Sequence, residues 1–332
     1  MDKSNFKRID KTDYCRFFNE VQFKTFFHNS KWHDFLEAEF RWLKFEYYLY
    51  KNEAILPLAR FRTFGEDKLV SLPFCEYGGP LLLVNDFNFE EFKACAISEF
   101  GENIRIKFHP QIILNQKIEN DEPGNETIAS WIEDLKNKSE KEILNSFRKT
   151  LKHEIRDAQN KKLIIRKCGN SGELKQFYGL YVANLRRKKT VPYPFAIFEF
   201  LFGRPETEIL LALYNDKIIS GDLFLNYGKF THYFFSATDY KYRKYGAAHL
   251  LLWEKIRDLV GKDKILDLGA TQKDSSLDTF KRGWGGRDYP IMQIGIKKSP
   301  KGLRSSRIRN IWGLLPNFAI KALSSKLIKY RI

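Results

Sequence analysis

A run of small residues lies where the sequence predicts the start of a helix. The small residues are Gly246, Ala247 and Ala248. Arg243 and Tyr245 come just before them, and an apolar helical pattern follows. A helix N-terminus carries free N–H groups and partial positive charge, and small residues let an anion reach them. These five residues are therefore candidates for binding the pyrophosphate of a cofactor, with Arg243 adding charge. Close packing of the helix start is the alternative explanation.

A second candidate is the turn Cys-Glu-Tyr-Gly-Gly-Pro at residues 75–80. Gly78 and Gly79 let the backbone approach a ligand, and the following proline stiffens the exit. Glu76 or Tyr77 could contact an acceptor amine. Glu76 is also a candidate catalytic base, although many transfers to amines need no protein base. A plain tight turn explains the same residues.

Four cations in a row, at residues 186–189, end a predicted helix. Cations at that end complement the helix dipole. Arginine also binds phosphate in a bidentate manner, so Arg186 and Arg187 are candidates for capturing the diphosphate of a nucleotide- or lipid-linked acceptor. Tyr193 could stack on a sugar or base. Asp267, at a predicted strand end, is a candidate for orienting a substrate amine, and a structural cap explains it equally well.

The composition limits the kinds of partner. A net charge of +16 over 332 residues favours phosphate-bearing or membrane-surface partners, although a genome-wide preference for lysine gives the same balance. The four cysteines are far apart and lack metal-binding spacing, so we expect no metal and a reducing, cytoplasmic location. No signal core and no apolar run of ~18 residues occur. None of the six histidines has a partner in a recognisable pattern, so all are treated as non-catalytic.

The elements that would position these residues are those of an α+β protein. In the first half, the pattern predicts helices over residues 32–40 and 87–100, a hairpin over 45–64 and strands over 68–74 and 104–109. The polar stretch at residues 115–127 contains Pro-Gly and reads as a surface loop or linker.

The second half repeats that order of elements. The pattern predicts a strand at 128–132, a long basic helix over 141–161, a strand at 162–168, helices over 172–187 and 195–202, and three meander strands. The helix after Gly246, a strand over 264–269, a short helix after Ser275 and a strand over 290–298 follow. We therefore expect two related domains, 1–126 and 127–298, and a basic amphipathic C-terminal helix within 299–332.

Most of the chain resembles a known family. A strand, R-x-x-G-x-A and a helix in succession are similar to the acyl-CoA-binding signature of GNAT acyltransferases. The sequence also resembles the Fem family of peptidoglycan aminoacyltransferases and the wider Fem-like GNAT group. The matching stretches are SLPFCEYGGPLL, LNSFRKTLKHEIRDAQNKKLIIR, SATDYKYRKYGAAHLLLWEKI, LDLGATQKDSSLDTFKRGWGG and RIRNIWGLLPNFAIKAL. The coiled-coil arm of some Fem proteins is not evident.

The resemblance implies two tandem GNAT-like domains, each a mostly antiparallel sheet flanked by helices, with the active cleft between or beside them. It places Phe280 and Lys281 at the acyl-transfer site, and Arg186 and Arg187 beside the acceptor channel. A lysine ammonium there could stabilise the oxyanion that forms when an amine attacks an ester or thioester carbonyl. A solvated lysine beside a core phenylalanine is the alternative.

These features predict an N-acyltransferase that acts on an amine of a cell-envelope precursor, either an amino sugar or a peptidoglycan peptide. Acyl-CoA as donor fits the R-x-x-G-A-A loop, and aminoacyl-tRNA fits the Fem resemblance and the positive charge. A non-catalytic nucleic-acid-binding protein is a third hypothesis, although its usual motifs are missing. The C-terminal segment could lie on the anionic inner face of a membrane or dock on the first domain.

Overall fold

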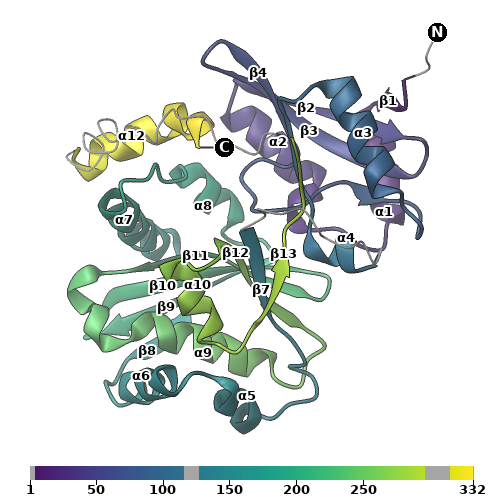
Figure 1. Cartoon of the computed structure of the whole chain (residues 1–332). Coiled ribbons are helices and arrows are strands. Elements are labelled where there is room, and N and C mark those ends of the chain that lie inside the picture. The colour runs from purple at the N-terminus through teal and green to yellow at the C-terminus, as the bar shows by residue number, and fades with distance from the viewer. Residues whose placement is uncertain (1–3, 116–126, 296–314, 332) are drawn as a thin grey trace. The chain divides into compact units, whose positions relative to one another are not determined.

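The computed structural model describes residues 4–115, 127–295 and 315–331 (Figure 1). The chain divides into two compact units, formed mainly by Met1–Ala129 and by Ser130–Asp288. Each unit is a mostly antiparallel seven-stranded sheet flanked by helices, which confirms the predicted α+β class. Within the described ranges, no helix is both long and apolar enough to cross a bilayer.

The first sheet has the strand order β1 (Phe6–Ile9), β2 (Leu43–Tyr50), β3 (Ala54–Thr63), β4 (Glu66–Val70), β6 (Ile104–Lys107) and β14 (Gln293–Gly295), with β5 (Leu81–Leu82) paired to β3. The predicted β2–β3 hairpin is confirmed: Lys51 and Asn52, with φ of 44° and 61°, make the tight turn. The helices of this unit are α1 (Lys11–Glu20), η1 (Phe26–His28), α2 (Ser30–Glu39), α3 (Phe89–Phe100) and α4 (Pro110–Asn115).

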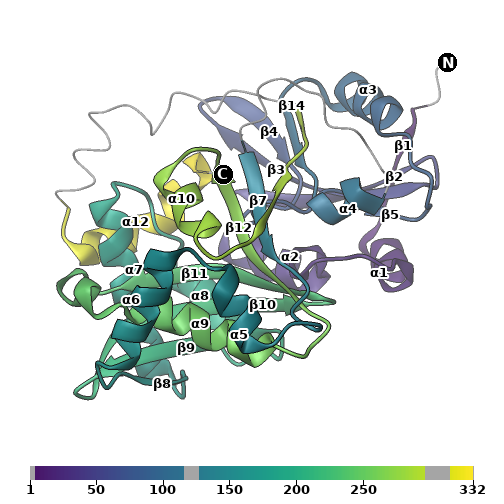
Figure 2. The same cartoon turned by 60° about the horizontal axis from the view of Figure 1, so that its bottom comes forward.

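The second sheet has the order β13 (Arg287–Pro290), β7 (Thr127–Ile132), β12 (Ile265–Gln272), β11 (Phe230–Thr238), β10 (Lys217–Tyr227), β9 (Thr207–Tyr214) and β8 (Ile164–Lys167). Its helices are α5 (Glu140–Ser146), α6 (Lys149–Gln159), α7 (Ser171–Arg187), α8 (Phe195–Leu201), η2 (Tyr240–Tyr245), α9 (Ala247–Leu259) and α10 (Ser276–Arg282). Helices α6 and α9 share the apolar core on one face of the sheet, and α7 packs against β10 and β11 (Figures 1 and 2).

The strands of the two sheets are connected in the same order. In the first, the meander β2–β3–β4 is followed by α3 and by β6, which pairs parallel to β4. In the second, the meander β9–β10–β11 is followed by α9 and by β12, which pairs parallel to β11. The repeated order of elements that the sequence predicted is therefore a repeated topology.

The predicted long helix over residues 141–161 is two helices. It breaks at Phe147, whose backbone is extended (φ −72°, ψ 151°). Its ring packs against Trp253 and Trp284, with ring centres 5.6 and 5.2 Å apart, and the Arg148 amide bonds to the Gly283 carbonyl at 2.9 Å. Tertiary contacts thus override a helical pattern that continues through the break.

The predicted final strand over residues 290–298 is also two strands. Strand β13 lies in the second sheet, whereas β14 pairs with β6 of the first. The chain therefore returns to the first sheet before residue 298, where the sequence placed the end of the second domain. Residues 116–126 of the predicted linker, and residues 299–314 of the predicted C-terminal helix, lie outside the described residues. The helix that is described there is α12 (Asn317–Leu327), followed by η3 (Ile328–Tyr330).

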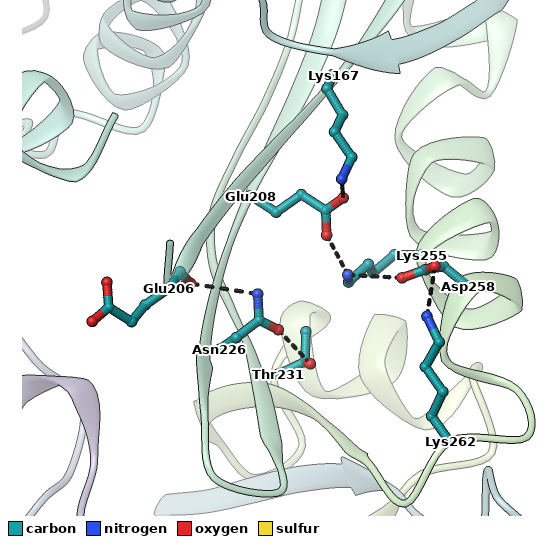
Figure 3. Close-up of polar contacts among 8 residues, drawn as sticks. All are labelled: Lys167, Glu206, Glu208, Asn226, Thr231, Lys255, Asp258 and Lys262. Atoms are coloured by element: carbon teal, nitrogen blue, oxygen red, sulfur yellow. Dashed lines mark hydrogen bonds and ion pairs between the residues drawn. The ribbon is translucent and has the colours of Figure 1, made fainter. Parts of the chain in front are cut away.

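A polar cluster fixes α9 to the sheet (Figure 3). The Lys255 side chain is only 3% exposed, and its ammonium bonds to Glu208 of β9 and, at 3.2 Å, to Asp258. Glu208 also pairs with Lys167 of β8 at 2.8 Å, and Asp258 with Lys262 at 2.8 Å. Because a buried ammonium is unfavourable without such partners, the cluster sets the position of α9 along β9.

Candidate functional site

The N-terminus of α9 has no capping side chain. Its N-cap residue is Gly246, and no side chain caps the helix. The amides of Ala247, Ala248 and His249 form no hydrogen bond with any residue in the described part of the chain. Three N–H groups thus lie at the positive end of a 13-residue helix, where the sequence predicted a helix start. Their role in binding a phosphate stays a prediction.

Packing also requires a small residue at Gly246. Its φ is +68°, and a Cβ there would lie 3.0 Å from the Cβ of Ala158 and 3.3 Å from the carbonyl oxygen of Glu154, both on α6. The glycine is therefore needed for the close approach of two helices, which was the alternative explanation considered from the sequence. Its role in letting an anion reach the amides stays a prediction.

Two arginines from distant elements meet on one tyrosine ring beside these amides. The guanidinium carbon of Arg187, at the end of α7, lies 4.0 Å from the centre of the Tyr240 ring, and that of Arg243 lies 4.2 Å from it. Neither arginine forms an ion pair with a carboxylate within the described residues, and Tyr240 is 51% exposed. Arg243, a candidate for the cofactor phosphate, and Arg187, a candidate for the acceptor diphosphate, thus lie against the same ring.

Further cations lie close to these two arginines. The Lys161 ammonium bonds to the carbonyl of Lys244 and lies 5.8 Å from the ring centre of Tyr245, and Tyr245 itself packs on Tyr214 with ring centres 4.6 Å apart. Arg186 is half-buried in the last turn of α7. We call Arg187, Tyr240, Arg243 and the amides of residues 247–249 the cationic loop site.

Lys281 is held inside the second unit by α10. Its side chain is 4% exposed, and the ammonium donates to the carbonyl oxygens of Gly269 and Ala270 at 2.8 and 2.9 Å. The preceding residue, Phe280, stacks on His249 of α9 with ring centres 5.8 Å apart. Lys281 is therefore a fixed cation, and its helix touches the helix that carries the cationic loop site.

His249 adds no strong charge to this region. Burial lowers its pKa from the usual range, Glu154 at 3.7 Å acts in the opposite direction, and Arg148 lowers the pKa further. The imidazole is thus mainly neutral at pH 7.

A pair that the sequence did not reveal lies where β11 and β12 part. The two strands pair only through Phe230–Ile265, Thr231–Leu266 and His232–Asp267. Nδ1 of His232 lies 2.8 Å from Oδ2 of Asp267, and the two residues are 2% and 0% exposed. From the sequence, His232 had no partner in a recognisable pattern. Its partner Asp267 lies 35 positions further along the chain, and only the strand register brings the two together.

Tyr193 lies close to an irregularity of β11. The register between β10 and β11 shifts at Leu223/Phe224, so Phe234 is an extra residue in β11. The Tyr193 ring packs on Phe234 and Phe235 at 6.3 and 5.4 Å between ring centres. The guanidinium carbon of Arg331 lies 4.6 Å from the centre of the same ring.

The C-terminal helix positions that arginine. Helix α12 packs on α7, with Ile320 and Ser324 fully buried, and the Arg331 guanidinium donates to the carbonyl of Val191 at 2.7 Å. The helix thus docks within the second unit, whereas we considered only the first domain or a membrane. Trp312 and Leu314, on which the membrane interpretation also rested, lie outside the described residues.

The candidates at residues 76–79 belong to the first unit. Tyr77, Gly78 and Gly79 are buried. A Cβ at Gly78 would lie 2.3 Å from the Leu72 side chain, and one at Gly79 would lie 3.2 Å from the Cα of Phe108. Packing therefore explains both glycines. Glu76 is half-buried near Lys107. Burial lowers the pKa of Lys107, and the nearby Glu76 carboxylate offsets only part of this decrease.

In a comparison with known protein families, residues 145–282 match the family model described as acetyltransferase (GNAT) domain. This part of the chain is a GNAT domain. The match covers the cationic loop site, the His232–Asp267 pair and Lys281, and it identifies the chain as an acyltransferase. A search of curated protein sequences gives no match.

Solved structures share the fold over nearly the whole chain. FemX is 12% identical with a TM-score of 0.61 and covers 90% of this chain and 99% of its own. L-PGS from Bacillus licheniformis is 10% identical with a TM-score of 0.52, covering 92% and 96%. A protein described as the C-terminal domain of a lysylphosphatidylglycerol synthetase from Agrobacterium fabrum is 10% identical with a TM-score of 0.52, covering 85% and 91%. At these identities the likeness concerns the fold, and the Fem-like GNAT fold that the sequence predicted is confirmed.

Proposed function

We propose that this protein is an N-acyltransferase that moves an acyl or aminoacyl group from a phosphate-bearing donor onto an amine of a cell-envelope precursor. The observation that carries the proposal is the placement of two groups of cationic and N–H donors: the cationic loop site, whose amides begin α9, and the buried Lys281 ammonium on α10. The Phe280–His249 contact joins α10 to α9. The FemX fold supports the cell-envelope substrate class.

In this reaction the donor phosphates bind the amides of residues 247–249, with Arg243 and Arg187 beside them. The acceptor amine attacks the acyl carbonyl carbon, and the carbonyl oxygen gains negative charge. Lys281, fixed in a largely water-excluded place, stabilises this oxyanion. The intermediate then collapses: a new C–N bond remains, the bond to the donor sulfur or oxygen breaks, and the amine proton leaves with the donor or through water.

Two donors fit this site. Coenzyme A carries a pyrophosphate that suits the amides of α9, and the supporting feature is the R-x-x-G-A-A loop. Aminoacyl-tRNA carries a phosphate chain that suits the wider set of cations, including Lys161 and Arg186. The supporting features are the net charge and the fold of FemX.

Binding and transfer measurements separate the two donors. Coenzyme A, if it is the donor, raises the melting temperature in a concentration-dependent way. Aminoacyl-tRNA, if it is the donor, binds with an affinity that falls steeply with salt. Transfer is measured with labelled acetyl-coenzyme A or aminoacyl-tRNA and, as acceptors, an amino-sugar nucleotide and a UDP-linked muropeptide. Absence of both binding and transfer would overturn the proposal.

A further inference from the structure

The last residue pair that joins β11 to β12 is an ionisable pair. Pairing stops at His232–Asp267, although β11 continues to Thr238 and β12 to Gln272. A buried carboxylate is unfavourable unless it accepts hydrogen bonds. Asp267 is hydrogen-bonded to Nδ1 of His232 and accepts a hydrogen bond from the amide of Gly269 at 2.8 Å. The carboxylate thereby holds the His232 ring with Nδ1 protonated.

Gly269 connects this pair to Lys281. Its N–H donates to Asp267, and its carbonyl accepts from the Lys281 ammonium at 2.8 Å. Its φ of +80° is a conformation that favours glycine, and it turns the backbone so that one residue bonds to the anion and to the cation. A continuous path of hydrogen bonds therefore runs from His232 through Asp267 and Gly269 to Lys281.

We propose that His232 and Asp267 are positioning residues for the transfer reaction: they fix Gly269, and Gly269 fixes the Lys281 ammonium. The inference rests on the proposed function, in which Lys281 stabilises the oxyanion. Neither residue needs to touch the substrate, which agrees with their exposures of 2% and 0%. A displacement of the ammonium by about 1 Å is enough to cost up to roughly 100-fold in rate.

A double-mutant cycle tests the path. Asp267→Asn is expected to lower kcat by about 10- to 100-fold while the KM for the donor changes by less than about threefold. In Asp267→Asn/Lys281→Met, kcat is expected to equal that of Lys281→Met alone, because a positioning residue has no effect once the positioned group is absent. His232→Gln is a second variant for the case that Asp267→Asn does not fold, with a smaller loss of kcat expected.

The matched control is Thr231→Val. Thr231 is the neighbouring buried residue in the same strand pairing. Its hydroxyl donates to the Asn226 side chain at 2.8 Å (Figure 3), a bond that is not part of the path to Lys281. It is expected to keep the wild-type kcat. Two results would contradict the positioning role and leave the proposed function intact. One is a kcat of the double variant that falls by the product of the two single losses. The other is a wild-type kcat in both Asp267→Asn and His232→Gln. Wild-type kcat in Lys281→Met would remove the role of Lys281 in the proposed function, and the positioning role with it.

Discussion

Phe280 stacks on His249, with their ring planes inclined by 25° and their centres 5.8 Å apart. The first residue precedes Lys281 on α10, and the second carries one of the open amides of α9. The contact therefore sets the spacing between the cation that would stabilise an oxyanion and the amides that would bind the donor phosphates. Catalysis needs both at a fixed distance, and neither helix alone provides it.

Lys281→Met is expected to lower kcat by at least about 100-fold, the usual effect of removing one donor to an oxyanion. The stability loss should be about 1–3 kcal/mol, because the carbonyls of Gly269 and Ala270 each lose the hydrogen bond from the Lys281 ammonium. Steady-state kinetics and urea denaturation measure the two effects. The control is Arg282→Met, whose exposed side chain pairs with Asp278 and Asp288; it is expected to retain most of the wild-type kcat. Similar kcat values in the two variants would contradict the assignment.

Arg187→Ala and Arg243→Ala are each expected to raise the KM for the donor, with little change in kcat, because both remove ground-state phosphate contacts. Each loss should be about 1.5–3 kcal/mol of binding free energy, the range for hydrogen bonds to charged groups, and it should shrink at high salt.

The control for the arginine variants is Arg204→Ala. Arg204 also lies over a ring, 3.7 Å from the centre of Phe200, but outside the cationic loop site. Isothermal titration with coenzyme A and filter binding of aminoacyl-tRNA measure the affinities. If Arg204→Ala lowers the affinity for the donor as much as Arg187→Ala does, the effect comes from the net charge, and the assignment of the cationic loop site as the donor site is wrong.

Features with local signals were predictable from the sequence. The loop at residues 243–248 and the β2–β3 hairpin each depend on residues adjacent in the chain. The break at Phe147 was not predictable, because the helical spacing continues and the cause is packing against Trp253 and Trp284. The His232–Asp267 pair depends on a parallel register, which composition and spacing do not encode. The glycines at positions 78 and 79 did not reveal their role, because glycine is required both where buried segments of the chain pack closely and where the backbone contacts a ligand.

Asp222 is expected to make the stability of the protein pH-dependent. The residue is fully buried on β10, and burial raises its pKa to about 7, although nearby Ser236 and Tyr233 act in the opposite direction. In the unfolded chain the group titrates near 4. Between these values the folded state keeps a proton that the unfolded state has released, so stability falls as pH rises from about 4 to 7 and then levels off.

Asp222→Asn removes this decline. The free energy of unfolding of the variant, minus that of wild type, should increase by on the order of 3 kcal/mol from pH 5 to pH 8. Urea denaturation at both pH values measures it. Asp216→Asn is the control, because Asp216 is exposed in the β9–β10 turn and its φ of 61° is tolerated by asparagine. Parallel pH curves for wild type and Asp222→Asn would show that the carboxyl ionises equally easily in both states.

The cluster around Lys255 gives a test of what holds α9, and with it the cationic loop site, on the sheet. Lys255→Met is expected to lower the free energy of unfolding by about 3 kcal/mol, the low end for breaking a buried pair, because Lys167 still neutralises Glu208. Lys262→Met is the matched control: it bonds to the same Asp258 but is 52% exposed, so it should cost less than about 1 kcal/mol. Urea denaturation measures both. Equal losses would mean that Lys255 contributes no more than a surface ion pair, and that apolar packing alone positions α9.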